Sequence, residues 1–311
     1  MAAYAVRRLG LSAIVIVGVS IAVFMMLRLV PGDPVTVMLA EGSTSQDAAG
    51  LKHELGLDRS LVAQYGLYAG HALTGNLGDS IRLREPVARL IGQRLPATLE
   101  LTIASLALAT VLGVLFGTFS AVRHGRFADH LIRVGSLAGV SLPSFWLGLM
   151  LILLFGVELG VLPIAGREGL DSLVLPAVTL AMVPLGIITR MVRSSVLDAL
   201  REDYIRTARA KGLGGSRILF GHALRNSLIP LVTVVGVQFG TLLGGAIIVE
   251  TVFAWPGIGS LLIDAVSARD FPLVQGIILM IAIGFVLVNL VVDLLYAVLD
   301  PRVRDSMEVA A

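Results

Sequence analysis

Six long stretches without any Asp, Glu, Lys or Arg dominate the pattern of polar and apolar positions along the chain. Each contains 18 to 24 residues, and they cover residues 9–27, 101–122, 134–157, 172–189, 226–249 and 271–292. A helix needs about 20 apolar residues to cross the hydrocarbon core of a bilayer, and helices satisfy their own backbone groups there. The pattern therefore predicts an all-α polytopic membrane protein with six transmembrane helices.

The first stretch also has the position of a secretory signal peptide, because it follows Arg7 and Arg8. Its 19 uncharged residues exceed the usual apolar core of about 7–15 residues. No small-residue cleavage site follows before Pro31. We therefore interpret residues 1–30 as an N-terminal tail and a retained first span.

The basic residues predict the orientation of the spans. Alternation puts the N-terminus, loop 123–133, segment 190–225 and the C-terminus on one side, with 15 Lys and Arg in total. The short loops on the other side, 158–171 and 250–270, contain two. Short loops rich in Lys and Arg stay in the cytoplasm, so both termini are predicted to be cytoplasmic.

The remaining boundaries follow from the spans. Residues 31–96 are expected to form an external loop with short helices, because Leu61, Tyr65 and Tyr68 recur at helical spacing. Residues 97–300 then contain the other five spans, with a cytoplasmic loop at about 193–226. Residues 301–311 form a cytoplasmic tail.

Composition excludes several kinds of chemistry. Hydrophobic residues make up 56% of the chain and charged residues 15%, where soluble domains average about 25% charged. Cysteine is absent from the sequence, which excludes disulfides, thiolate catalysis and cysteine-bound metals. We expect no catalytic residue, no metal site and no nucleic-acid partner.

The lysines exclude an ATPase site of the common kind. The two lysines, Lys52 and Lys211, precede His and Gly, whereas a phosphate-binding loop needs Lys followed by Ser or Thr. If the protein is part of a pump, ATP is therefore hydrolysed on another chain.

A glycine stripe in the fifth span has two interpretations. Gly236, Gly240 and Gly244 lie four residues apart, which brings small residues to one helix face and allows two backbones to approach closely. Ordinary helix packing and a moving or dimerising face both fit this spacing.

Charged residues near the spans are few, and intramembrane charge is costly. Asp293 lies deepest, one turn after Asn289. It is expected either to form a structural pair or to lie on the substrate path. Glu100 and Glu250 lie at span ends, where contact with lipid headgroups would satisfy them.

Residues 193–226 form the most informative segment, RSSVLDALREDYIRTARAKGLGGSRILFGHALRN. Leu197, Leu200, Tyr204 and Ala208 share a helical face. Glycines at 212, 214 and 215 end this helix before a second short one begins. Both a solvated basic loop and a knuckle that docks in a groove of a partner fit the pattern.

This segment resembles the cytoplasmic EAA loop of binding-protein-dependent ABC importer permeases. With the family's glycine placed on Gly212, only Ala208, Gly212 and Leu224 match the general pattern. The runs DYIRTARAKGL and HALRNSLIP are similar to those of dipeptide and oligopeptide permeases. So are RLVPGDP, LGLDRSL, RLPATLEL, ETVFAWPGIG and DLLYAVLDPRVR, and the resemblance extends from about residue 28 to 304.

The resemblance implies a type I ABC importer permease fold in a bacterial inner membrane. It implies a second homologous permease subunit, two ABC ATPase subunits that hold ATP and Mg, and an external substrate-binding protein, with no cofactor on this chain. It also implies an ATPase-coupling site formed by Asp203, Tyr204, Ala208, Gly212, Leu224 and Arg225. We further expect a positive φ at Gly212, a conformation that residues with a β-carbon resist.

Dipeptides or short oligopeptides are the expected cargo. Nickel chelates, glutathione and other small solutes are alternatives within the same class. A secondary transporter is the alternative from a different class.

Overall fold

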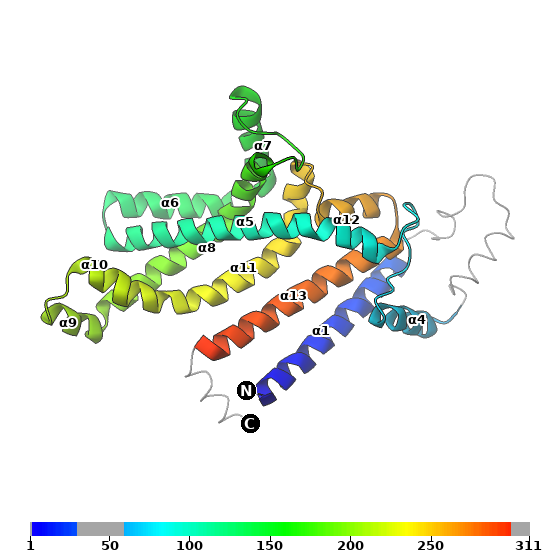
Figure 1. The fold of residues 1–311 in the computed structure, drawn as a ribbon, viewed down its shortest axis with the longest axis horizontal. Helices are drawn as coiled ribbons and strands as arrows, with labels where there is room; N and C mark the ends of the chain where they lie inside the picture. The colour runs from blue at the N-terminus through cyan, green and yellow to red at the C-terminus, as the bar shows by residue number, and fades with distance from the viewer. Residues whose placement is uncertain (1, 30–58, 300–311) are drawn as a thin grey trace.

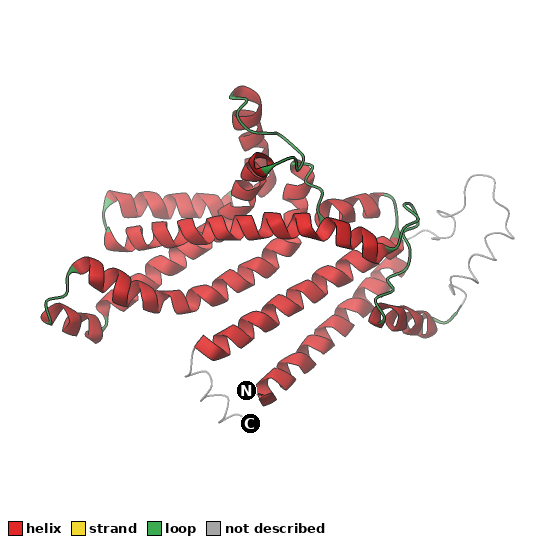
Figure 2. Cartoon of the chain, viewed as in Figure 1, coloured by secondary structure: helices red, strands yellow, loops and turns green. Residues whose placement is uncertain are grey.

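A computed structural model describes residues 2–29 and 59–299, and this part of the chain is almost entirely helical (Figures 1 and 2). Residues 31–58 of the predicted external loop and the predicted tail 301–311 lie outside the described residues. In chain order, the helices are α1 (Ala2–Leu29), α4 (Leu61–Leu73), α5 (Val87–Val122), α6 (Phe127–Ser141), α7 (Ser144–Leu151), α8 (Leu170–Arg201), α9 (Asp203–Ala210), α10 (Gly215–Ile218), α11 (Leu224–Val252), α12 (Ile258–Ser267) and α13 (Phe271–Leu299). Two π-helical segments, η1 (Ile152–Glu158) and η2 (Leu219–Ala223), continue α7 and α10.

Five of these helices, α1, α5, α8, α11 and α13, are long and apolar enough to cross a membrane. They correspond to five of the six stretches expected from the sequence. The short helix expected around Leu61, Tyr65 and Tyr68 is also present, as α4.

The third expected span is broken rather than continuous. Helix α6 and the α7–η1 segment meet at an angle of 105°. Leu142 is extended, with ψ 131°, and Pro143 follows it. Proline lacks an N–H group and disfavours helical geometry at the residue before it, so the chain turns inside an uncharged stretch.

Close packing of α5 against α8 forms the centre of the bundle. A β-carbon at Gly113 would lie 2.6 Å from Cγ2 of Ile188, and one at Gly117 would lie 2.7 Å from the carbonyl oxygen of Thr189. The glycines allow the two backbones to approach closely, as is common between membrane helices.

The two ends of the bundle carry different elements (Figure 1). At one end, α9 and α10 follow the end of α8, and α1 begins and α13 ends toward the same side. At the opposite end, α4 and α12 lie near the start of α5. Two functional regions can therefore be described, one at each end.

Candidate functional site

The loop between α8 and α11 folds into a small knuckle with its own apolar core. Glu202 is extended, with ψ 151°, and separates α8 from α9. Ile205 and Ala208 on α9 pack with Ile218 and Ala223, and all four side chains are buried. The knuckle therefore presents a defined surface rather than a solvated coil.

Gly212 determines the turn between α9 and α10. Its φ is +78°, a conformation that glycine adopts readily and that residues with a β-carbon resist. The positive φ expected at this glycine is confirmed. A β-carbon at this position would meet no atom within 4 Å, so the requirement for glycine arises from the backbone alone.

The six expected coupling residues occupy three kinds of environment. Asp203 and Tyr204 lie on the outer surface of α9, and Arg225 is exposed at the start of α11. Ala208 is only 8% exposed and faces the knuckle's own core. Leu224 is half-buried against the α8 packing cluster. The structure thus brings Asp203 and Tyr204 to the surface, whereas Ala208 supports the knuckle from inside.

A buried carboxylate connects three helices near the knuckle. Asp129 on α6 is 1% exposed. It accepts hydrogen bonds from Ser120 Oγ on α5 at 2.6 Å, from the Gly125 backbone N–H at 3.0 Å, and from Arg193 Nε and Nη2 on α8 at 2.7 and 2.9 Å. Arg193 Nη2 also lies 3.0 Å from Nδ1 of His124. This cluster holds α5, α6 and α8 together. Its Arg193 lies ten residues before the start of α9.

A second buried carboxyl group organises the opposite end. Glu250 near the end of α11 has no exposed side-chain surface. Its oxygens accept hydrogen bonds from Thr98 Oγ at 2.6 Å and from the backbone N–H groups of Gly259 and Ser260 at 2.7 and 3.0 Å. Those two N–H groups belong to the first turn of α12, where a helix favours an acidic partner.

The expectation that headgroup contact satisfies Glu250 is therefore wrong. Glu250 is bonded within the protein, because α12 folds back over the end of α11. Glu100 forms an ion pair with Arg167, whose Nε lies 2.8 Å from a Glu100 oxygen and whose guanidinium carbon lies 5.8 Å from the centre of the Trp255 ring.

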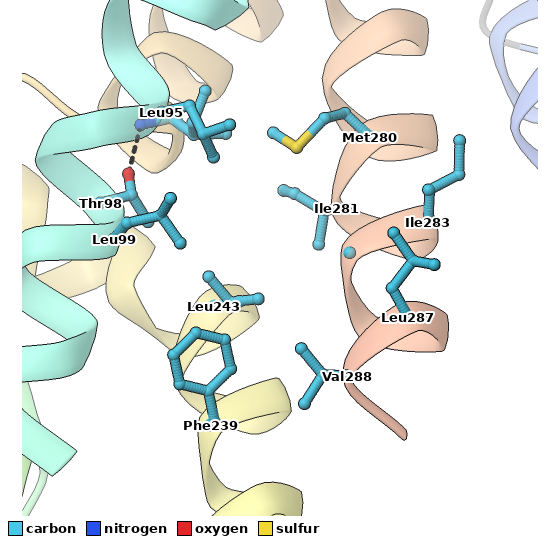
Figure 3. A pocket seen from close by; sticks show the side chains of 12 residues that line it. Leu95, Thr98, Leu99, Phe239, Leu243, Met280, Ile281, Ile283, Leu287 and Val288 are labelled. Carbon is cyan, nitrogen blue, oxygen red and sulfur yellow. Dashed lines mark hydrogen bonds between the residues drawn. The ribbon is translucent and has the colours of Figure 1, made fainter. Parts of the chain in front are cut away.

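An apolar pocket of about 330 Å³ lies beside Thr98 (Figure 3). Helix α5 contributes Leu95, Thr98 and Leu99, helix α11 contributes Phe239 and Leu243, and the remaining wall is largely α13. The Thr98 hydroxyl is already engaged, because it accepts a hydrogen bond from the Ile258 N–H at 2.8 Å and donates to Glu250. A molecule in this pocket would therefore be held by its fit and by apolar contacts rather than by the Thr98 hydroxyl.

The glycine stripe of α11 lies partly against α13. A β-carbon at Gly236 would lie 1.9 Å from Cγ2 of Val292, and one at Gly240 would lie 2.9 Å from Cδ2 of Phe285. Gly244 has no such neighbour within 4 Å. Close helix packing accounts for Gly236 and Gly240, while the Asp293 side chain lies outside what the structure describes.

Two solved structures share this fold. One chain of the "MetNI methionine ABC transporter" in an inward-facing conformation superposes with a TM-score of 0.57 at 20% identity, covering 68% of this chain and 96% of that chain. A chain of "an amino acid ABC transporter with histidines" superposes with a TM-score of 0.51 at 16% identity, covering 69% and 94%. The fold is that of the membrane subunits of ABC transporters.

Sequence comparison then identifies the family. Residues 113–305 match "Binding-protein-dependent transport system inner membrane component", and residues 1–102 match its N-terminal region. The chain belongs to this family and is a multi-pass inner-membrane transport subunit.

Curated relatives match over nearly the whole length. The di/tripeptide transport system permease protein DppB of Pseudomonas aeruginosa is 46% identical over 98% of this chain and 99% of that protein. The dipeptide transport system permease protein DppB of Escherichia coli is 42% identical over 98% and 99%. The glutathione transport system permease protein GsiC of Escherichia coli is 42% identical over 97% and 98%.

Proposed function

We propose that this chain is the permease subunit of an ATP-driven importer for dipeptides or short oligopeptides, which an external binding protein delivers. The identity of 46% with a di/tripeptide permease carries the proposal on cargo. Glutathione is the second candidate, supported by 42% identity with a glutathione permease. Because glutathione is itself a tripeptide, the two candidates share a backbone of amide groups and terminal charges.

The partners proposed for the assembly are a second homologous permease, two ABC ATPase subunits with ATP and Mg, and the binding protein. This chain contributes half of the translocation path. Its termini and the α9–α10 end are assigned to the cytoplasm by the positive-inside distribution of Lys and Arg. The α4–α12 end is then external.

The knuckle is proposed as the site where the ATPase docks. Its own apolar core maintains its shape, so its surface is organised before a partner binds, which reduces the entropy cost of association. Tyr204, 40% exposed on the outer side of α9, is the expected anchor, since exposed aromatic side chains are enriched at interface hot spots. Asp203 and Arg206 flank it, with 3.6 Å between their charged groups.

The coupling proposal is tested with Tyr204→Ala in the complete complex. Loss of the aromatic contact is expected to reduce ATPase copurification and peptide uptake about tenfold, corresponding to roughly 1.4 kcal/mol of binding. The matched control is Phe127→Ala, which removes an aromatic side chain that is 82% exposed at the same end of the bundle but on α6. Equal uptake by the Tyr204 variant, the control and the unaltered complex would contradict the assignment.

Ala208→Arg is not a suitable docking test, because the new side chain would disrupt the core of the knuckle. Gly212→Ala is more informative. It adds no clash, and its backbone cost of about 1 kcal/mol is expected to weaken coupling without preventing membrane insertion. Normal uptake and normal ATPase association by this variant would show that the turn tolerates another geometry.

Cargo is tested by uptake of labelled dialanine into proteoliposomes that contain the complex, the binding protein and internal ATP. Unlabelled dipeptides are expected to compete more strongly than glutathione. The reverse order would favour glutathione, and accumulation by this chain alone, without ATPases, would favour the secondary-transporter alternative.

A further inference from the structure

The short turn Ser80–Glu85, which precedes α5, is held by backbone hydrogen bonds. Residues Asp79 and Pro86 form an isolated antiparallel bridge. Inside it, the Ser80 N–H donates to the Glu85 carbonyl at 2.9 Å, and the Arg84 N–H donates to the Ser80 carbonyl at 3.0 Å. The turn Ser80–Glu85 lies at the end of the molecule where α12 and α4 are found (Figure 1).

A buried carboxylate anchors this turn to the rest of the protein. Asp270, between α12 and α13, is 1% exposed. It accepts hydrogen bonds from Ser80 Oγ at 2.5 Å, from the Arg82 N–H at 3.2 Å and from the Leu273 N–H at 3.2 Å. The donors to this carboxylate are thus a hydroxyl and backbone N–H groups, and in the described part of the chain no guanidinium lies within 4 Å of it.

Two arginines here adopt a backbone conformation that suits glycine better. Arg84 and Arg269 both have φ +53°, a left-handed conformation that residues with a β-carbon disfavour. Such backbone strain persists where the surrounding structure imposes it, and it is concentrated at functional sites. The sequence therefore keeps a long cationic side chain at two positions where glycine would relieve the strain.

Arg82, Arg84 and Arg269 are all exposed around the Asp270 anchor. In the described part of the chain, none of the three has an ion-pair partner within 4 Å. In sequence, Asp79 and Glu85 flank the two arginines of the turn, and a Glu85 oxygen lies 3.8 Å from Arg89 Nε. Leu83, 47% exposed, lies between two of the arginines.

We propose that the turn Ser80–Glu85, together with Arg269, is a docking surface for an acidic patch on the external binding protein. The proposal rests on the proposed function, which puts this end outside the cell. Arg82, Arg84 and Arg269 have no ion-pair partner among the described residues, and Leu83 is exposed beside two of them on the anchored turn. Such a surface suits protein recognition, because arginine is enriched at interfaces. A turn fixed before contact also loses little conformational entropy on binding.

The test uses the complete complex in nanodiscs of neutral phosphatidylcholine and titrates the binding protein while ATP hydrolysis is measured. The concentration of binding protein that gives half-maximal stimulation is expected to rise about tenfold in the triple variant Arg82→Glu, Arg84→Glu, Arg269→Glu, because like charges would then face each other. Maximal stimulation is expected to stay unchanged. Arg59→Glu, an exposed arginine before α4, is the matched control and should change the half-maximal concentration by less than about twofold.

A second pair of variants separates docking from structure. Arg84→Gly and Arg269→Gly remove charge and backbone strain together. If the arginines are merely structural, the binding protein should stimulate ATP hydrolysis by these variants at least as well as it does in the unaltered complex. If they dock the binding protein, the half-maximal concentration should rise about threefold in each.

Salt gives a measurement that needs no variant. The half-maximal concentration of the unaltered complex should rise between about 50 and 300 mM NaCl, as screening shortens the Debye length. Independence of salt, or an unchanged half-maximal concentration in the triple variant, overturns the proposal. A defect seen only in nanodiscs of anionic lipid assigns the arginines to headgroups instead. Absence of any stimulation of the unaltered complex refutes the proposed function itself.

Discussion

Removal of Arg193 is the most informative perturbation of the bundle. Its guanidinium makes two charge-assisted hydrogen bonds, at 2.7 and 2.9 Å, to a carboxylate that is 1% exposed. Arg193→Ala leaves Asp129 with hydrogen bonds from Ser120 Oγ and the Gly125 N–H and with His124 Nδ1 3.5 Å from Oδ2, but without the guanidinium charge. Breaking a buried pair by removing one partner costs about 3–5 kcal/mol, because the remaining charge is uncompensated.

The double variant Asp129→Leu, Arg193→Met separates the pair's net contribution from this penalty. Replacement of both charges by apolar side chains is often close to neutral, so the double variant should lose no more than about 1–2 kcal/mol. The single variants Asp129→Leu and Arg193→Met should then be strongly non-additive, with an interaction energy of about 3 kcal/mol in the cycle. Arg133→Ala, an exposed arginine on the same α6 helix, should change stability by about 0.5 kcal/mol or less.

The free energy of unfolding is measured by SDS titration of the purified chain in mixed micelles. A loss below about 1 kcal/mol for Arg193→Ala would refute the reasoning, since a buried and unpaired carboxylate cannot be that inexpensive. Equal losses in the double variant and in Arg193→Ala would show that the charges also specify the helix arrangement. Peptide uptake measured in parallel then tells whether this cluster transmits movement from the knuckle along α8.

Two further predictions concern topology and the opposite end of the bundle. Single cysteines at Thr74 and Ser267 should react with a membrane-impermeant reagent on intact cells and one at Ser216 should not; the opposite pattern would reverse the orientation. Gly259→Ala should lower stability by about 1–3 kcal/mol in the same SDS titration, because its β-carbon would lie 2.5 Å from the Ile247 Cα and 2.9 Å from Glu250 Oε2. Gly92→Ala, where nothing lies within 4 Å, should be neutral or stabilising, and equal stability of both variants would disprove the packing argument.

The membrane spans could be predicted from the sequence because a bilayer constrains each spanning helix independently of the others. Each helix must be long, apolar and almost free of charge, and all of this is visible within one segment. The knuckle was readable for a similar reason: its helix, its glycine turn and its basic residues are contiguous. The break at Pro143 also carries a local signal, but the 105° angle between α6 and the α7–η1 segment depends on packing.

Partners of the buried carboxylates were decided only by the tertiary structure. Asp129 meets Arg193 across 64 positions, Glu250 meets Thr98 across 152, and Asp270 meets Ser80 across 190. The sequence pattern gives the cost of burying such a charge but not the donor that compensates it, since that donor lies on a segment far away in the chain. The sequence therefore determined which segments enter the membrane, and the packing of those segments decided which polar groups meet, because hydrogen bonds act over about 3 Å between residues that the chain separates widely.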